Sequence, residues 1–167
     1  KSNERAADAV KEGRCADEIV AVEIPQRKGD PLLVETDEGV RPGTTMESLA
    51  ALKPAFTKDG TITAANASQI SDAGSALVLM SEKAVNARGV NPLGQFVSYG
   101  MVAGPDSASL LHQPSNAIRA ALARAGKSIA DVDLFENNEA FAAVGVASIA
   151  DLGISDEIVN VNGGAIA

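Results

Sequence analysis

A helix-forming stretch between two short apolar runs most constrains the fold of this chain. The stretch 136–153 (ENNEAFAAVGVASIADLG) carries apolar or small residues at i, i+3, i+4, i+7, i+8 and i+11, which places them on one helix face. These residues are Phe141, Val144, Gly145, Ser148, Ile149 and Leu152. The runs 131–136 (DVDLFE) and 157–162 (EIVNVN) indicate strands, and Gly153 suits a left-handed helix end. Strand, helix and strand in succession predict a βαβ unit, which builds parallel sheets.

Polar side chains stand at the start of the predicted helix, where α/β proteins often bind ligands. Asn137, Asn138 and Glu139 directly follow the first strand, and ligands of open sheets collect at the carboxyl ends of strands. The free N–H groups and the dipole of a helix start favour negative charge. An Asn amide there can hold a water or an oxyanion, but Asn is also a favoured N-cap. Spacing alone favours the cap and leaves both roles open.

The rest of the chain predicts helices that alternate with short strands. We expect helices over 2–12, 45–52, 81–88 and 115–125, and strands over 18–24, 32–36, 74–80 and 93–102. Thr44 with Glu47 three residues later predicts a capping box at the second helix. The first two strands are expected to form a short ribbon outside the main sheet. The pattern as a whole predicts an α/β fold with a mainly parallel or mixed sheet.

Composition excludes several classes of protein. Hydrophobic residues make up 46% of the 167 residues and the mean hydropathy is +0.06, which indicates a globular chain. No apolar run reaches the ~18–20 residues that span a bilayer, and residues 1–14 lack the apolar core of a signal peptide. A net charge of −8 argues against general nucleic-acid binding. A single Cys fits a reducing compartment, so we expect a cytoplasmic protein without membrane or nucleic-acid partners.

Segments spread along the whole chain resemble one family. NEAFAAV at 138–144 and NVNGGAIA at 160–167 are similar to the thiolases, that is, the acetyl-CoA acetyltransferases and 3-ketoacyl-CoA thiolases. QRKGDP at 26–31 and the stretch 62–82 (ITAANASQISDAGSALVLMSE) resemble it too, in the family's order.

The resemblance implies a thiolase-like fold with layered αβα architecture. It divides the chain into three parts. Residues 1–60 would be an excursion like the family's loop domain, with a CoA-binding wall. Residues 61–90 would hold the last strand and helix of the N-terminal half, and residues 91–167 the first part of the C-terminal half.

The resemblance also implies a chemistry. Thiolases interconvert two acyl-CoA thioesters with a 3-ketoacyl-CoA and free CoA, so CoA is a substrate and neither a resident cofactor nor a metal is expected. Asn138 matches the family Asn that holds a water of the oxyanion hole. Ala140 and Phe141 match positions that line the acyl and pantetheine channel. A plain core role suits Phe141 equally well.

Further positions match the family's CoA-binding wall. Ser68 matches a Ser that contacts pantetheine, and Arg41 matches an Arg near the adenine and phosphate, where a planar guanidinium suits phosphate or stacking. Leu52, Ala55 and Phe56 match the apolar side of the adenine site. Plainer roles stay open for each: a turn-stabilising Ser, an exposed Arg, and ordinary apolar packing.

The family's nucleophile and base do not match any residue here. The resemblance places the nucleophilic Cys upstream of this sequence and the His after the GGAIA stretch, so Cys15 is predicted to pack and His112 to have a surface or structural role. The missing initiator Met and the apolar end at 165–167 indicate a chain cut from something longer. The resemblance implies a middle-to-late piece of a thiolase subunit that forms homo-oligomers, as dimers or tetramers. Because the nucleophile and the base are missing, we expect the piece to be inactive alone. Two alternatives stay open: a non-catalytic CoA- or lipid-binding relative, and a scaffolding piece without a ligand.

Overall fold

The computed structural model of the chain describes residues 1–72, 75–104 and 110–167. Its α-helices are α1 (Ser2–Lys11), α2 (Met46–Ala50), α3 (Glu82–Arg88), α4 (Gln113–Ala125) and α5 (Ala142–Leu152). Short 3-10 turns are η1 (Ala16–Glu18), η2 (Leu110–His112), η3 (Ile129–Asp131) and η4 (Asp156–Ile158). The strands β1 (Val22–Ile24) and β2 (Leu32–Val34) pair with each other.

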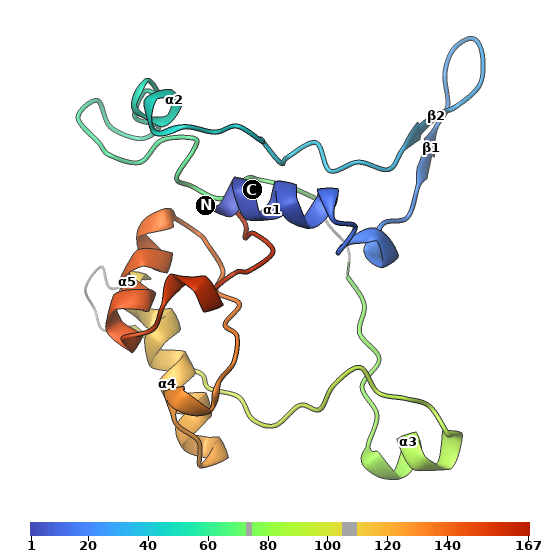
Figure 1. Cartoon of the computed structure of the whole chain (residues 1–167), viewed down its shortest axis with the longest axis vertical. Coiled ribbons are helices and arrows are strands. Elements are labelled where there is room, and N and C mark those ends of the chain that lie inside the picture. The colour runs from blue at the N-terminus through green and yellow to red at the C-terminus, as the bar shows by residue number, and fades with distance from the viewer. Residues whose placement is uncertain (73–74, 105–109) are drawn as a thin grey trace.

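The core of the structure lies where α4 and α5 pack against the C-terminal segment (Figure 1). Phe135, Leu152 and Val159 form its buried centre. Partly buried side chains surround them: Ile118, Ile129, Val132, Ile149, Ile154 and Ile158. A core of branched aliphatic residues with one aromatic ring agrees with an aromatic content of only 3%.

The predicted apolar face of α5 is confirmed. Val144, Ser148 and Leu152, which are spaced four residues apart, are buried, whereas Val146 on another face is exposed. The helix ends as expected at Gly153, whose φ of 65° is left-handed. The helix starts at Ala142, which is later in the chain than the predicted start.

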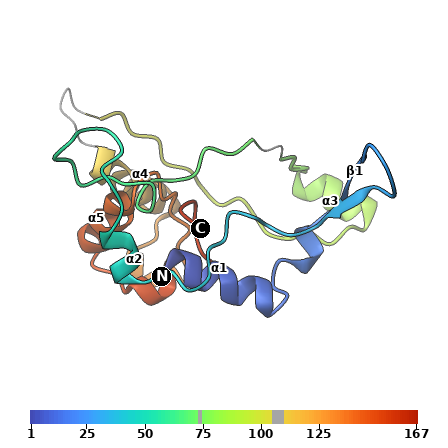
Figure 2. The same cartoon turned by 90° about the horizontal axis from the view of Figure 1, so that it is seen from above.

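Helix α1 lies beside this core, close to the C-terminal segment (Figures 1 and 2). Its Arg5 guanidinium donates hydrogen bonds to the carbonyl oxygens of Val159, at 2.6 Å, and Asp156, at 2.9 Å. Gly163 approaches α1 so closely that a Cβ on this glycine would lie 2.7 Å from the Cβ of Ala6. The first and last described segments are therefore in direct contact.

The predicted βαβ unit is reduced to one parallel bridge between Phe135 and Val159. Phe135 donates a backbone bond to Ile158, and Asn160 donates one back to Phe135, at 2.8 and 2.9 Å. The predicted strands 131–136 and 157–162 are wrong beyond this bridge, because η3 and η4 occupy their starts. Serine caps favour these turns: Ser128 forms a capping box at η3, and the Ser155 hydroxyl accepts the N–H of Glu157 at η4.

The predicted ribbon near the N-terminus is confirmed. Strands β1 and β2 are antiparallel, with Glu23 opposite Leu33, and form a hairpin that projects away from the core (Figures 1 and 2). Both strands are shorter than expected, because η1 includes Glu18 and the ladder stops at Val34.

Helix ends follow local capping rules, but the cap of α2 lies one residue later than predicted. The predicted box of Thr44 and Glu47 is wrong: Thr45 caps α2, and its hydroxyl accepts the N–H of Ser48, at 3.2 Å. Thr44 instead donates its hydroxyl to the carbonyl oxygen of Arg41, at 2.7 Å. The ends of α3 are as expected, with the Ser81 hydroxyl accepting the Ala84 N–H and Gly89 left-handed.

The strands predicted over 74–80 and 93–102 are not formed in the described part of the chain; Gly74 itself lies outside it. Residues 75–80 and 93–102 run without a ladder partner, and Leu77 and Leu93 are almost fully exposed. A strand needs a hydrogen-bonding neighbour, and none of the described segments lies in register with these two.

One end of the second segment docks onto α4. The Ser98 hydroxyl donates to the Ala121 carbonyl oxygen, at 2.7 Å, and the guanidinium of Arg124 lies 4.1 Å from the centre of the Tyr99 ring. A Cβ on Gly100 would come within 2.6 Å of the Ala121 nitrogen. The backbone at Gly100 therefore approaches α4 more closely than any side chain would allow.

Candidate functional site

The segment that leads into α5 is extended and not helical. Phe141 occupies the N-cap position and makes no side-chain capping bond. The cap predicted for Asn137 or Asn138 is therefore wrong. The reason is that residues 137–142 are bonded to two other segments, which hold them straight and delay the helix.

The first of these segments contains Asn160, whose side chain is buried at 4% exposure. Its Oδ1 accepts the backbone N–H of Asn137, at 2.7 Å, and its Nδ2 donates to the carbonyl oxygen of Asn137, at 2.8 Å. The Nδ2 also donates to Oε1 of Glu139, at 3.1 Å. One side chain thus pairs with the backbone of Asn137 as a neighbouring strand would.

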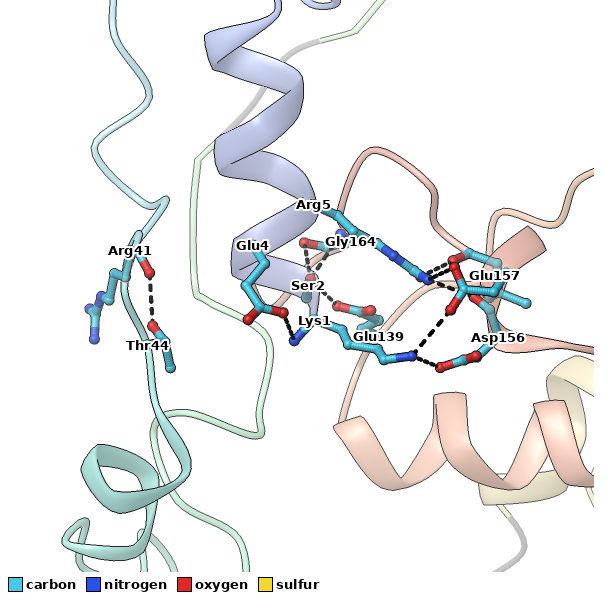
Figure 3. Close-up of polar contacts among 11 residues, drawn as sticks. Lys1, Ser2, Glu4, Arg5, Arg41, Thr44, Glu139, Asp156, Glu157 and Gly164 are labelled. Carbon is cyan, nitrogen blue, oxygen red and sulfur yellow. Dashed lines mark hydrogen bonds and ion pairs between the residues drawn. The ribbon is translucent and has the colours of Figure 1, made fainter.

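Glu139 extends this network to α1. Its Oε2 accepts the hydroxyl of Ser2, at 2.7 Å, and the backbone N–H of Ile166, at 3.2 Å. The Ser2 oxygen in turn accepts the N–H of Gly164, at 2.9 Å. Figure 3 shows the Ser2 and Glu139 side chains pointing toward each other beside Gly164.

Gly164 leaves room for these contacts. A Cβ at this position would lie 2.7 Å from Oε2 of Glu139 and 2.8 Å from Nδ2 of Asn160. Any larger residue would displace one of the two side chains. The second glycine of the pair therefore has a steric role in this network.

Asn138 lies between two residues that are fixed in this way. Its side chain is exposed and makes no hydrogen bond to any of the residues that the structure describes. The amide is therefore available to a water or to a ligand from outside.

The second segment that holds this region straight is the loop 66–68. Ser68 donates its N–H to the carbonyl oxygen of Ala140, at 3.1 Å, and Ala142 donates to the carbonyl oxygen of Asn66, at 2.8 Å. Ala67 and Phe141 form an antiparallel bridge. The structure thus brings together four residues that the family resemblance singled out: Ser68, Asn138, Ala140 and Phe141.

The other predicted residues lie elsewhere. Arg41 donates its backbone N–H to Oδ1 of Asn3, at 2.7 Å, and its side chain points away from Ser2 and Glu139 (Figure 3). Leu52, Ala55 and Phe56 are exposed. No hydrogen bond within the described ranges links these four predicted residues to the Asn138 segment.

A cavity of about 320 Å³ lies between α1, α2 and α5. Its lining includes polar groups from Ser2, Glu139 and Asn160, and apolar ones from Leu49 and Val146. Asn138 and Ser68 are not part of this lining. The exposed amide of Asn138 therefore opens to solvent and not into this cavity.

His112 has the structural role that was predicted for it. Its Nδ1 lies 2.7 Å from Oδ2 of Asp151, and the Ser115 hydroxyl donates to the same oxygen, at 2.8 Å. The bonds from His112 and then Ser115 hold the pKa of the Asp151 carboxyl below its usual range. Because the imidazole and the hydroxyl both contact the carboxylate, this cluster links α4 to α5 and does not activate the serine. Cys15 is half-buried.

Sequence reasoning missed the part that Asn160 plays. A weak signal was present: Asn160 lies three residues before the Gly pair at 163–164, and Asn tolerates the left-handed backbone better than most residues. The structure places Asn160 at φ 48°. Its buried amide and the carboxylate of Glu139 form the centre of the network.

Solved structures define the class of fold. The chain is similar to a crystal structure of Bacillus anthracis acetyl-CoA acetyltransferase, with a TM-score of 0.89 and 42% identity over 99% of this chain and 41% of that one. It is also similar to human mitochondrial 3-ketoacyl-CoA thiolase, with a TM-score of 0.84 and 39% identity over the same shares of the two chains. The chain has the α/β fold of these enzymes.

Sequence comparisons identify the family. The thiolase N-terminal domain matches residues 1–83 and the thiolase C-terminal domain matches residues 90–167. This chain belongs to the thiolase family. A probable acetyl-CoA acetyltransferase of Mycolicibacterium smegmatis is 53% identical over 100% of this chain and 43% of its own length. An acetyl-CoA acetyltransferase of Pseudomonas aeruginosa is 49% identical over 99% of this chain and 42% of its own length. The chain thus spans less than half the length of these relatives.

Proposed function

We propose that the whole protein is an acyl-CoA:acetyl-CoA C-acyltransferase, which makes or cleaves 3-ketoacyl-CoA by thioester Claisen chemistry. The observation that carries the proposal is the exposed, unpaired amide of Asn138 between two anchored neighbours, within the chain's described part. A donor of this kind suits a water that stabilises the negative charge on a thioester or enolate oxygen.

Asn138 would act together with a nucleophile and a proton-transferring group. Neither Cys15 nor His112 supplies these groups. Acyl transfer of this type needs a thiolate nucleophile and an imidazole or thiol that moves protons. Cys15 lies beyond the end of α1, and His112 is bonded to Asp151. We propose that these 167 residues alone do not turn over substrate and contribute oxyanion support and part of the CoA-binding wall.

The CoA-binding wall would have two parts. Ser68, Ala140 and Phe141 lie beside Asn138 and suit the amide-rich pantetheine arm, which carries the thioester. Arg41, with its exposed guanidinium, suits the phosphates and adenine.

Leu52, Ala55 and Phe56 offer the apolar contact for the adenine ring. We further propose the division suggested by the resemblance: 1–60 as the CoA-binding excursion, 61–90 as the end of the N-terminal half and 91–167 as the start of the C-terminal half.

We propose a cytoplasmic enzyme of fatty-acid and lipid metabolism that works as a homo-oligomer. Among the described residues, the structure contains no helix that has both the length and the apolar character to cross a membrane.

The test is an activity assay on the complete gene product that contains this chain. Cleavage of acetoacetyl-CoA by CoA should be measurable, and Asn138→Ala should lower kcat about 10²–10³-fold, the usual effect of losing one oxyanion donor. Asn162→Ala is the matched control: its Oδ1 accepts a bond from Arg14, at 2.9 Å, and it should leave kcat unchanged. An inactive complete protein, or an Asn138→Ala variant as active as the wild type, would contradict the proposal.

A non-catalytic CoA-binding protein is the second candidate, because neither Cys15 nor His112 lies in the site. Calorimetric titration of CoA into the complete protein separates the two. Binding without turnover would favour the binder, and no heat at millimolar CoA would favour a scaffold without a ligand. Arg41→Ala should weaken CoA binding, whereas Arg88→Ala on α3, of the same charge and also exposed, should not.

A further inference from the structure

We infer that Asn160 and Glu139 are positioning residues that fix the backbone on both sides of Asn138 for the proposed oxyanion role. The inference rests on the proposed function and goes beyond it, because neither side chain is exposed and both act through their neighbours. The geometry that carries it is the bonding of Asn160 to the residues directly before and after Asn138.

Asn160 is committed to this task. Both backbone polar atoms of Asn137 are bonded to its amide, at 2.7 and 2.8 Å, and the second amide proton goes to Glu139. The residue is buried and has a left-handed backbone, an arrangement that costs free energy and persists only where the surroundings fix it. The amide orientation is defined by its partners, since Asn137 N–H needs an acceptor and Glu139 a donor.

Glu139 fixes the other side of Asn138. Its carboxylate accepts bonds from Asn160, Ser2 and Ile166, which come from three segments of the chain. A carboxylate only accepts hydrogen bonds, so the Glu139 carboxylate can accept all three bonds at once. The backbone on both sides of Asn138 is therefore held while its own side chain stays free. A fixed backbone restricts where the Asn138 amide can lie, and this contributes to the preorganisation that an oxyanion donor requires.

The chemistry of the network suggests a swap of amide and carboxylate. In Asn160→Asp, the introduced carboxylate would face the carbonyl oxygen of Asn137 and the Glu139 carboxylate, which breaks two bonds. In Glu139→Gln, the introduced amide can serve either Asn160 or the pair of donors Ser2 and Ile166, but not both. In the double variant, the glutamine at position 139 can donate to the aspartate at position 160 and still accept from Ser2 and Ile166. Only the bond to the Asn137 carbonyl oxygen stays lost.

The experiment measures kcat and the KM for CoA of the complete gene product with acetoacetyl-CoA. Each single variant should lower kcat about 10²-fold, as expected when a reacting group is misplaced by roughly 1 Å. The KM for CoA should change less than about threefold, because Ser68 and Arg41 do not contact Asn160. The double variant should have a kcat at least about tenfold higher than that of either single variant.

A control separates positioning from simple loss of stability. Asn162→Asp makes the same change two residues away, on an exposed side chain that contacts Arg14, and should keep wild-type kcat. Thermal midpoints of all variants are measured in parallel. A kcat that follows the thermal midpoint, or a double variant no better than the single ones, would overturn the inference.

Failure of the inference can be told apart from failure of the proposed function. If the wild type is inactive, the proposed function is wrong. If Asn138→Ala loses activity while Asn160→Asp and Glu139→Gln do not, the function holds and only the positioning role is wrong.

Discussion

The backbone N–H of Ser68 donates a hydrogen bond to the carbonyl oxygen of Ala140, at 3.1 Å. This bond joins the loop 66–68 to the segment that carries Asn138, although the two are far apart in the chain. Asn66 stiffens the loop, because its Oδ1 accepts the N–H of Thr63, at 2.7 Å, and its Nδ2 donates to the carbonyl oxygen of Thr61, at 3.0 Å. The backbone of Ser68 is thereby held against the segment that carries Asn138.

Replacing Ser68 by Ala should therefore weaken CoA binding without slowing the chemical step. The backbone bond to Ala140 persists, and the loss of one neutral hydrogen bond costs about 0.5–1.5 kcal/mol, which raises KM for CoA roughly 2–13-fold. Steady-state kinetics of the complete protein provide the measurement. Ser81→Ala, which removes a cap from α3, is the matched control and should not alter KM. A drop in kcat at constant KM would argue against a binding role for Ser68.

Gly100 should not tolerate a side chain. A Cβ there would approach the Ala121 nitrogen to 2.6 Å and the Ala120 Cβ to 3.1 Å, so Gly100→Ala must push the segment off α4. Such overpacking costs typically about 1–3 kcal/mol in the free energy of unfolding. Gly94→Ala, with nothing within 4 Å of the new Cβ, serves as the control in urea unfolding of both variants. Equal midpoints for the two variants would show that residues 98–100 do not pack on α4.

Ser148→Ala should stabilise the protein. The Ser148 hydroxyl is 2% exposed on the buried face of α5 and has no hydrogen-bond partner among the described residues. An unsatisfied buried hydroxyl costs about 1–3 kcal/mol, so its removal should raise the free energy of unfolding by about 1 kcal/mol. Ser115→Ala should do the opposite, because the equally buried Ser115 hydroxyl is bonded to Asp151. Urea unfolding measures both, and a destabilised Ser148→Ala variant would contradict the expectation.

Asp151 should contribute stability that disappears in acid. Hydrogen bonds from His112 first, and then from Ser115, lower the pKa of its carboxyl in the folded state below the usual value of 3.8. A lowered pKa in the folded state stabilises the protein above the unfolded pKa, and this stability is lost as the pH falls through the folded pKa. Asp151→Asn should therefore lower the urea midpoint at about pH 7, and the difference from wild type should shrink below about pH 4.

The exposed Asp133 provides the comparison for Asp151, since it makes no hydrogen bond or ion pair to the described residues. Asp133→Asn should leave the urea midpoint unchanged across the same pH range. A gap between wild type and Asp151→Asn that is the same in acid as at neutral pH would refute the linkage.

Local signals predicted helices and turns well because their causes lie within a few residues. Each of these signals acts within its own helix: the Ser81 cap in α3, the apolar period in α5, and the left-handed Gly89, Gly126 and Gly153 at the ends of α3, α4 and α5. The hairpin of β1 and β2 likewise joins neighbouring runs. Such features follow from short-range geometry alone.

Strands and the site network were harder to predict because their partners are distant. Leu77 and Leu93 belong to apolar runs that favour strands, yet no described segment pairs with them. The start of α5 was misplaced because Asn160 and Asn66, which hold residues 137–142 extended, act from elsewhere in the chain. The family resemblance points to Asn138, whereas spacing alone favours a cap.

The close approach of Gly163 to Ala6 couples two ends of the chain sterically. A methyl group at residue 163 would meet the Ala6 Cβ and the carbonyl oxygen of Ser2, so α1 would have to retreat. Ser2 would then leave Glu139, and the segment around Asn138 would lose one of its supports. Bulk added at Ala6 or Gly163 would thus disturb a support of the Asn138 segment. At Gly163 the left-handed φ of 91° adds a second reason, in the backbone itself, against a side chain.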